Sequence, residues 1–259
     1  MSIKQIIFDF FYYLSAGTFI SFGVLRQNQL GRRYFIYHGL GIAVIILCSY
    51  FFSGQSFLDK EATYWLIASL VFITTFSLTV GYRNRLPLAS YFLGVLTILG
   101  MLVLEITTTH PYPLHIPLMI NLGLSTLLMG FAMNAMCLGH WYLVQPKLSI
   151  NELKRVCLVL VILIVLRFLF GTLGLYHTIQ GKSEGEIYRY LLGNSQGIFV
   201  LMRWCWGLLG PLGLAYPIWA TVKIRSTQSA TGILYVAVLF IMTGEILSLY
   251  LASQFGIAL

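Results

Sequence analysis

Eight stretches of about twenty mostly apolar residues follow one another along the chain. A helix of that length crosses the hydrocarbon core of a bilayer and satisfies its backbone hydrogen bonds internally. A soluble domain of 259 residues could not bury so much apolar surface: 58% of the residues are hydrophobic and 9% are charged, against about 25% charged in soluble domains. The sequence therefore predicts an all-α fold, a polytopic integral membrane helix bundle of eight transmembrane helices. The expected spans are 6–25, 34–53, 63–81, 88–108, 115–144, 154–175, 198–222 and 230–255.

The connections between these spans alternate in charge. Ten cations fall in connections that share one side of the membrane, and four fall on the other side together with four acidic residues. Because cytoplasmic loops carry an excess of Lys and Arg, we expect the ten in the cytoplasm and both chain termini on the extracytoplasmic side. The ten cations are Arg26, Arg32, Arg33, Arg83, Arg85, Lys147, Lys154, Arg155, Lys223 and Arg225.

The net charge of +8 does not indicate nucleic acid as a partner. The basic residues are spread over short loops between apolar spans, whereas a nucleic-acid site gathers them on one face or tail. Anionic lipid on the cytoplasmic side accounts for them. The expected location is a bacterial inner membrane, with the lipid bilayer itself as the first partner.

The chain is expected to form a single membrane domain, 1–259, and a short repeat divides it in two. "TVGYR" at 79–83 precedes a span that ends in Glu-Ile, and "TVKIR" at 221–225 precedes another span that contains Glu-Ile. Two four-helix halves, 1–110 and 111–259, would explain the match. Matches of five residues also arise by chance in apolar sequence.

The common catalytic motifs of soluble enzymes do not assign a function to this chain. There is no GxxxxGK[ST] and no HExxH, and "GNSQG" at 193–197 lies in the long outer connection 176–197, without the strand that a nucleophile elbow follows. The four cysteines all lie inside apolar runs, without a CxxC pair, so neither c-type haem nor a thiolate metal site is expected. ATP-driven transport by this chain alone is excluded.

Charged residues inside the spans carry the strongest functional signal, because each costs about 2.5–3.5 kcal/mol to insert at the centre of a bilayer. Glu105, Arg167, Arg203 and Glu245 fall in the outer half of four different spans, and Asp9 lies near the outer start of the first. One interpretation is structural pairing of the acids with the arginines. The other is a polar cavity open to the outside, in which Glu105 and Glu245 move protons and the two arginines bind substrate.

The histidines suggest two further sites. His110 and Tyr112 lie in the proline-rich connection after Glu105, where they would line the rim of the cavity and contact substrate; His115 follows, but two ligands make a weak metal site and none is predicted. His38 and His140 share a depth near the cytoplasmic side, as the two axial ligands of a b-type haem would. Against a haem, His140 lies beside Trp141 and Tyr142 and is well explained as an interfacial anchor.

Three functions follow from these patterns. The leading hypothesis is a bacterial inner-membrane subunit of an electron-transfer assembly that binds quinone or a b-type haem, with other membrane or periplasmic subunits as partners and no catalysis beyond handling quinone. The alternative is a secondary transporter or channel for a small solute or ion, with Glu245 and Arg167 as the coupling pair. The third is a membrane scaffold without chemistry of its own.

Overall fold

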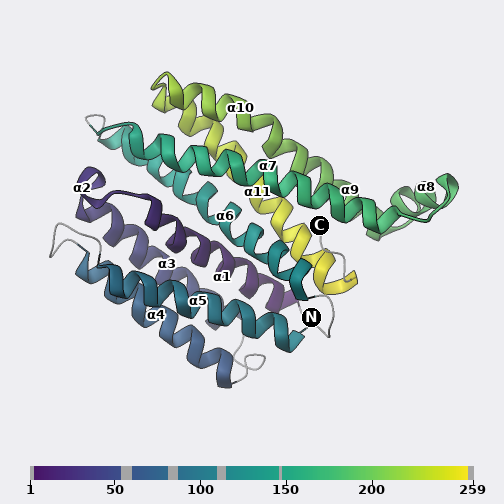
Figure 1. Ribbon diagram of the computed structural model, residues 1–259, viewed down its shortest axis with the longest axis horizontal. Helices are drawn as coiled ribbons and strands as arrows, with labels where there is room; N and C mark the ends of the chain where they lie inside the picture. The colour runs from purple at the N-terminus through teal and green to yellow at the C-terminus, as the bar shows by residue number, and fades with distance from the viewer. Residues whose placement is uncertain (1–2, 54–59, 81–86, 110–114, 146–147, 256–259) are drawn as a thin grey trace.

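The computed structural model describes residues 3–53, 60–80, 87–109, 115–145 and 148–255, and within these ranges all side chains except those of 52–53, 105–109 and 115–117. Every regular element of this described part is a helix (Figure 1). In chain order the elements are α1 (Ile3–Ser21), the 3-10 turn η1 (Phe22–Val24), α2 (Gln27–Leu30), α3 (Arg32–Ser53), α4 (Lys60–Thr79), α5 (Leu88–Thr109), α6 (His115–Val144), α7 (Asn151–Ile179), α8 (Glu184–Leu192), α9 (Ser195–Trp204), the π turn η3 (Cys205–Leu209), α10 (Gly210–Lys223) and α11 (Thr227–Phe255).

Within the described residues, seven helical segments are long and apolar enough to cross a membrane. An eighth apolar helix, Leu88–Leu104 within α5, is shorter than these seven. The prediction of an all-helical, multi-pass membrane protein is therefore confirmed. The seven segments are Ile3–Val24, Arg32–Phe51, Lys60–Thr79, Leu118–Val144, Asn151–Ile179, Ser195–Lys223 and Thr227–Phe255.

The long helices lie roughly side by side, with α1, α6 and α11 in the middle (Figure 1). On one flank α3 packs on α1 and α4, and α4 packs on α5. On the other flank α7 packs on α6, and α10 packs on both α7 and α11. The bundle thus has two groups of helices, joined mainly where α1 lies against α6.

The close contact between α1 and α6 depends on two glycines. A Cβ atom on Gly130 of α6 would lie 1.9 Å from the carbonyl carbon of Gly17 on α1, and a Cβ on Gly17 would lie 1.8 Å from the carbonyl oxygen of Thr126. Only residues without a side chain allow the two backbones to come so close, which is how helices associate in membranes, where van der Waals packing replaces the hydrophobic effect. One turn further on, Asn134 Nδ2 donates a hydrogen bond of 2.6 Å to Ser21 Oγ.

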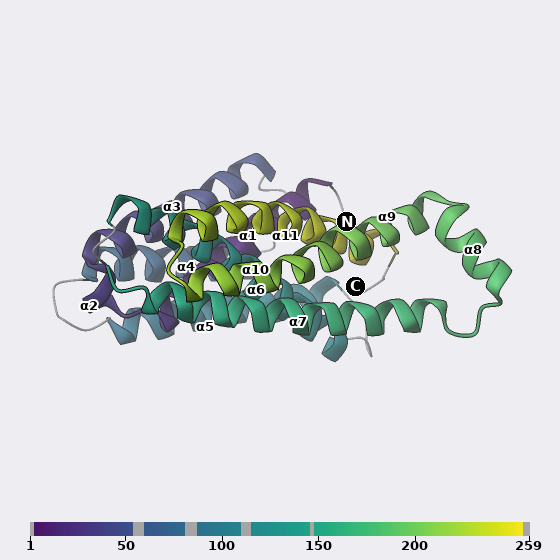
Figure 2. The same cartoon turned by 90° about the horizontal axis from the view of Figure 1, so that it is seen from above.

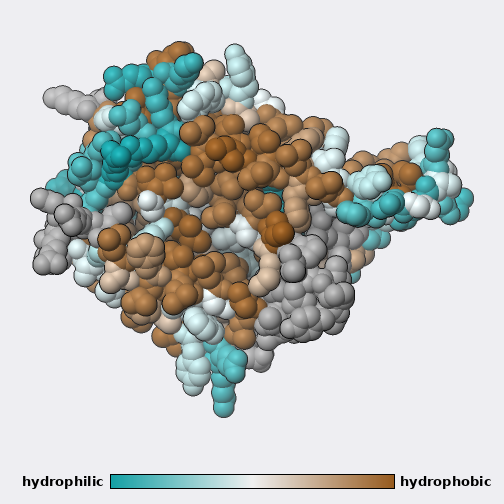
Figure 3. Space-filling model, in the orientation of Figure 1, coloured by the Kyte–Doolittle hydropathy of each residue, from teal (hydrophilic) through white to brown (hydrophobic). Residues whose placement is uncertain are grey.

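The surface has the polarity expected of a protein in a bilayer. Figure 3 shows a broad apolar belt across the middle of one face, with hydrophilic residues gathered toward the edges and at the tip of the α8 arm. Large apolar side chains are exposed on the long helices, including Phe51, Phe92, Leu169 and Leu239. In water such a surface would drive aggregation, whereas in lipid it needs no cover.

The structure corrects the sequence expectation for the connection 176–197, which is mostly helical. α7 continues to Ile179, and α8 then forms an arm with α9 that projects beyond the bundle (Figure 2). Local capping explains both helix starts. Ser183 and Glu186 form a reciprocal capping box at α8, and Asn194 Oδ1 accepts a 2.9 Å hydrogen bond from the N–H of Gly197 at the start of α9. "GNSQG" is thus a helix start.

Candidate functional site

The carboxylate of Glu245 on α11 is the centre of a buried charge cluster. Its Oε1 accepts hydrogen bonds from Arg167 Nε at 3.0 Å and from Arg203 Nη2 at 2.9 Å. Its Oε2 accepts from Arg167 Nη2 at 2.9 Å and from the hydroxyl of Ser125 at 2.6 Å. Two arginines from separate helices, α7 and α9, therefore share one carboxylate, and Arg167 binds it through both oxygens.

Arg167 also ties α6 into the cluster. Its Nη1 donates to the side-chain oxygen of Asn121, and its Nη2 donates to Ser125 Oγ at 2.9 Å and to Ser248 Oγ at 3.0 Å. Asn121 and Ser125 lie four residues apart and so share a face of α6, while Ser248 lies one turn beyond Glu245 on α11. The guanidinium group thereby joins the side chains of three transmembrane helices.

Arg203 lies directly before the π turn. The carbonyl of Gly207 would receive the N–H of residue 211 in a regular α-helix, but residue 211 is proline and has no N–H. Arg203 Nη1 donates to that carbonyl at 3.4 Å. Gly207 also packs backbone to backbone on Gly244 of α11, since a Cβ on either residue would lie about 2.5 Å from the other's Cα. The helix that carries Arg203 is thus irregular at the point where it meets the helix that carries Glu245.

The three charged side chains are sealed from solvent. Arg167 retains 1% of its surface exposed, and Arg203 and Glu245 retain 0%. Removing charges from water is expensive, and it is compensated only where the charges pair closely and their remaining donors and acceptors are satisfied. The described geometry meets that requirement. It matches the structural-pairing interpretation, because side chains sealed in this way do not line an open cavity.

The other residues proposed for the outer site are only partly covered by the structure. Glu105 lies in α5, but its side chain is outside the described residues, and so are His110 and Tyr112. Asp9 is buried on α1 with 5% of its surface exposed. Of the four charges expected to meet, the structure therefore places Arg167, Arg203 and Glu245 together. Their functional roles stay predictions.

The two histidines proposed as haem ligands differ in their surroundings. The ring of His38 on α3 contacts that of Tyr34 in a tilted arrangement, with centroids 4.1 Å apart, and it meets the edge of Trp141 at 6.3 Å. Its Nδ1 lies 2.7 Å from the Tyr34 carbonyl oxygen. His140 on α6 is exposed. Among the described side chains, no group of three His, Cys, Asp or Glu is arranged to hold a metal ion. The haem-ligand roles of His38 and His140 stay predictions.

Sequence reasoning missed the neutral members of the cluster, Asn121, Ser125 and Ser248. Hydroxyl and amide side chains are common in transmembrane helices, so their presence alone carries little information. Their spacing was the available signal: Asn121 and Ser125 are four residues apart, and Ser248 is three residues from Glu245. Polar residues at helical spacing mark one polar face, and such a face indicates a buried network.

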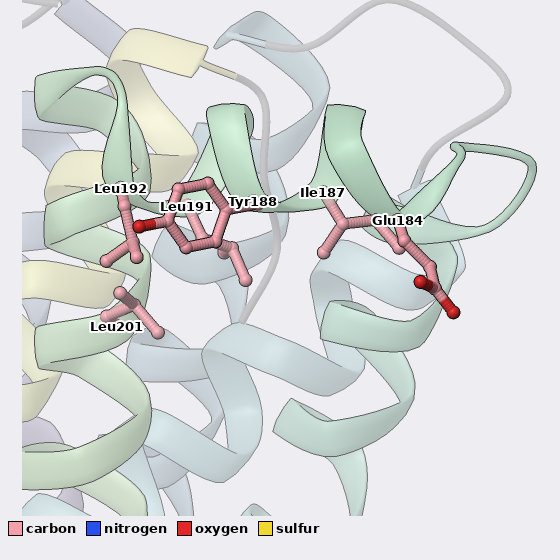
Figure 4. A pocket seen from close by; sticks show the side chains of 6 residues that line it. All are labelled: Glu184, Ile187, Tyr188, Leu191, Leu192 and Leu201. Carbon is pink, nitrogen blue, oxygen red and sulfur yellow. The ribbon is translucent and has the colours of Figure 1, made fainter.

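A groove lies away from the charges, between α8 and α9. It has a volume of about 360 Å³. Figure 4 shows Tyr188, Leu191 and Leu192 of α8 near Leu201 of α9, with Glu184 at the edge. A ligand site usually combines apolar walls with a few polar groups that fix the orientation of the ligand. This groove has apolar walls and one exposed carboxylate at its edge, so it is a weaker candidate than the charge cluster.

Comparisons of the chain with protein families, with curated proteins and with solved structures give no match.

Proposed function

We propose that the protein is a proton-coupled secondary transporter for a small solute, with Glu245 as the proton-binding group and Arg167 and Arg203 as the groups that hold the solute. One observation carries the proposal: a single buried carboxylate is shared by two arginines from separate helices. Ionisable residues inside a bilayer that pair with one another are typical of ion and substrate pathways.

The sealed cluster would be the occluded state of a transport cycle. When Glu245 binds a proton, the two guanidinium groups lose the one negative charge that they share, and they then bind a solute that restores the lost interaction. Proton and solute would therefore occupy the site together, which is the basis of coupling.

Movement of α9 and α10 would open the site. The π turn η3 and Pro211 interrupt regular hydrogen bonding in this segment, directly beside Arg203, and Pro217 lies further along α10. Discontinuous transmembrane helices next to charged side chains form the substrate sites of many transporters. Transport by rocking of the helices around the cluster would need no new fold.

This function has more support than the electron-transfer hypothesis. A b-type haem needs two axial imidazoles that face each other across the macrocycle, but His140 is exposed and His38 packs against Tyr34 and Trp141. A scaffold would need no arginine pair inside the bilayer, because apolar packing of similar volume is often as stable as a buried ion pair. Partner subunits are not required for the proposed cycle.

We further propose eight transmembrane spans in a bacterial inner membrane, with both termini on the extracytoplasmic side. Two features support this topology. α5 supplies an apolar helix between the candidate spans α4 and α6, and the first turn of α1 lies at the same end of the bundle as the last turn of α11 (Figures 1 and 2).

Single cysteines introduced at Asn28 and Glu184, two exposed positions expected on opposite sides of the membrane, test this topology after replacement of the four native cysteines. A membrane-impermeant thiol reagent should label Glu184→Cys in intact spheroplasts, and it should label Asn28→Cys only after lysis. Labelling of Asn28→Cys in intact spheroplasts would contradict the proposed orientation.

Solute-driven proton flux tests the transport function. The purified protein is reconstituted into liposomes that contain a pH-sensitive dye, and a panel of small anions and neutral solutes is added outside. We expect at least one solute to acidify the lumen with wild-type protein, and we expect Glu245→Gln to abolish the response, while Glu184→Gln on the exposed arm leaves it intact. If no solute of the panel acidifies the lumen, the proposal is rejected. A reduced-minus-oxidised haem band that disappears in His38→Ala would favour the electron-transfer hypothesis instead.

A further inference from the structure

We infer that the transported solute is a small monocarboxylate of about the size of acetate or propionate, and that the side chain of Glu245 occupies its place in the structure as a tethered substitute. The inference rests on the proposed function, and it names the substrate class of the same site.

The hydrogen bonds at Glu245 define the chemistry of the occupant. A carboxylate has about four lone-pair positions on its two oxygens. Each oxygen of Glu245 accepts two bonds: Oε1 from Arg167 and Arg203, and Oε2 from Arg167 and Ser125. The donors therefore saturate one planar carboxylate. Tetrahedral phosphate or sulfate would bring further oxygens that these four bonds leave without donors, which is expensive in a buried site.

The charge of the occupant follows from the same contacts. Arg167 and Arg203 are both buried, with at most 1% of their surface exposed, and both bind the one carboxylate. A neutral solute in place of the carboxylate would remove that negative charge from between two buried cations. A monoanion keeps it. An anion is therefore strongly preferred over a neutral molecule of the same shape.

Packing limits the size of the occupant. Gly207 and Gly244 bring the backbones of η3 and α11 into contact beside Arg203, and a Cβ on either glycine would lie 2.6 Å from Arg203 Nη1. The space next to the guanidinium group is thus already filled. The room for the apolar part of a solute is the room that the two methylene groups of Glu245 occupy, which corresponds to acetate or propionate.

Coupling of solute transport to protons follows from the replacement of the Glu245 carboxylate by the carboxylate of the solute. A proton that binds the Glu245 carboxylate removes one negative charge from the site, and the carboxylate of the solute restores it. The protonated side chain of Glu245 turns away from the arginines and the carboxylate of the solute takes its place, so one proton and one monocarboxylate load together with no change in the charge of the site. The cycle is an electroneutral symport, in which no covalent bond to the solute forms or breaks.

Chemical rescue tests the carboxylate site without any transport. Glu245→Ala removes a fragment equivalent to acetate, and Glu245→Gly removes a fragment equivalent to propionate. We expect acetate to raise the thermal midpoint of purified Glu245→Ala, and propionate to raise that of Glu245→Gly, while equal ionic strengths of chloride and sulfate do not. Glu245→Gln is the matched control, because its amide fills the same space and no anion should stabilise it. Equal stabilisation of the Ala variant by acetate and sulfate would overturn the inference.

Uptake by wild-type protein tests the substrate class and does not depend on the folding of any variant. With an inward proton gradient, we expect the protein to raise the initial rate of radiolabelled acetate or propionate uptake about tenfold above the rate at which the neutral acids cross protein-free liposomes. We expect this protein-dependent rate to be unaffected by valinomycin and potassium and to be insensitive to excess phosphate. Proton-coupled uptake of a different solute without any uptake of these acids would reject the inference and leave the transport function standing. Rescue of the variants by the acids without solute-driven proton flux in wild type would reject transport and leave the carboxylate site.

Discussion

At the scale of single residues, the charged side chains of the cluster depend on one another for their stability inside the bundle. Glu245 is tolerable inside the bundle because two arginines donate to it, and each arginine is tolerable because Glu245 accepts. The neutral members add further hydrogen bonds. Asn121 accepts from Nη1 of Arg167, which has no described bond to the carboxylate, and Ser125 accepts from Nη2, which also donates to Glu245. Removing different members should therefore have effects of different size.

Glu245→Gln should lower the free energy of unfolding by about 3–5 kcal/mol, because it leaves two buried guanidinium groups without a negative partner. Asn121→Ala should lower it by about 1–3 kcal/mol, the range for one buried donor that loses its acceptor. Denaturation of the purified protein in mixed micelles, followed by tryptophan fluorescence, measures both. Equal effects of the two substitutions would contradict the central position of Glu245.

At the scale of elements, one proline accounts for an irregular segment. Pro211 cannot donate to the Gly207 carbonyl, the chain forms the π turn Cys205–Leu209 immediately before it, and the guanidinium group of Arg203 approaches the freed carbonyl. The proline and the buried charge are therefore linked through the Gly207 carbonyl, within about two helical turns.

Pro211→Ala should restore a backbone donor at this position. We expect the variant to be more stable by about 1 kcal/mol and to show slower solute-driven proton flux, because the interruption that lets α9 and α10 move is removed. Thermal midpoints and the liposome assay should thus change in opposite directions. Gly213→Ala is the control: a Cβ there meets open space, so its flux should equal that of wild type.

The capping box at the start of α8 is a second local feature that stabilises a helix, and it lies outside the membrane spans. The pKa of Glu186 is lowered from its ordinary value of 4.5, first by the hydrogen bond from the Ser183 backbone N–H and then by that from the Ser183 hydroxyl. A carboxyl whose folded pKa is lowered stabilises its helix at pH values above the ordinary pKa, and this support is lost as pH falls through the lowered value.

Amide hydrogen exchange in α8 should therefore accelerate, relative to intrinsic rates, as pH falls below about 4.5. The acceleration should disappear in Glu186→Gln, whose side-chain oxygen still accepts at neutral and acidic pH. Ser183→Ala should raise exchange at every pH. Unchanged protection of α8 between pH 6 and pH 3 in the wild type would show that the capping box does not hold this helix.

At the scale of the whole molecule, two groups of helices meet along α1 and α6. The cluster around Glu245 lies entirely within the second group, which comprises α6, α7, α9, α10 and α11. The approach of Gly17 to Gly130 holds this second group against the first. The seam sets the distance between the two parts of the bundle but contributes no charged side chain to the hydrogen bonds described for the cluster.

Gly130→Ala should loosen this seam. The added Cβ would lie 1.9 Å from backbone atoms of Gly17, which cannot move aside without shifting α1, so we expect a loss of about 1–3 kcal/mol or more. Gly123→Ala lies on the same helix and meets open space, so it should leave stability unchanged or raise it slightly. Thermal midpoints of the two variants, measured side by side, check the comparison.

Much of the fold was predictable because lipid is a simple solvent. The expected spans 63–81 and 154–175 correspond to α4 (Lys60–Thr79) and α7 (Asn151–Ile179), and the others agree about as closely. Length and apolarity along a continuous run decide whether a helix enters a bilayer, and both are local properties. α8 was missed because it is short and amphipathic, and its capping box was a signal that went unused.

The candidate site was predictable in part. Buried charges must pair, so Arg167, Arg203 and Glu245 could be grouped from their depth alone. The geometry of the pairing could not be read in this way. Depth does not say how far each helix is rotated about its axis, so it does not tell which oxygen of Glu245 meets which arginine, or that Ser125 joins them.

The sequence by itself determined that this chain is a helical, multi-pass membrane protein, and it determined which charges would have to be buried, because both follow from the transfer of local segments from water to lipid. Only the tertiary structure decided that one carboxylate serves two arginines and that the cluster is sealed. Those outcomes depend on contacts between residues far apart in the chain, such as the backbone contact of Gly207 with Gly244 beside Arg203, which set how closely the helices approach and which side chains then face one another.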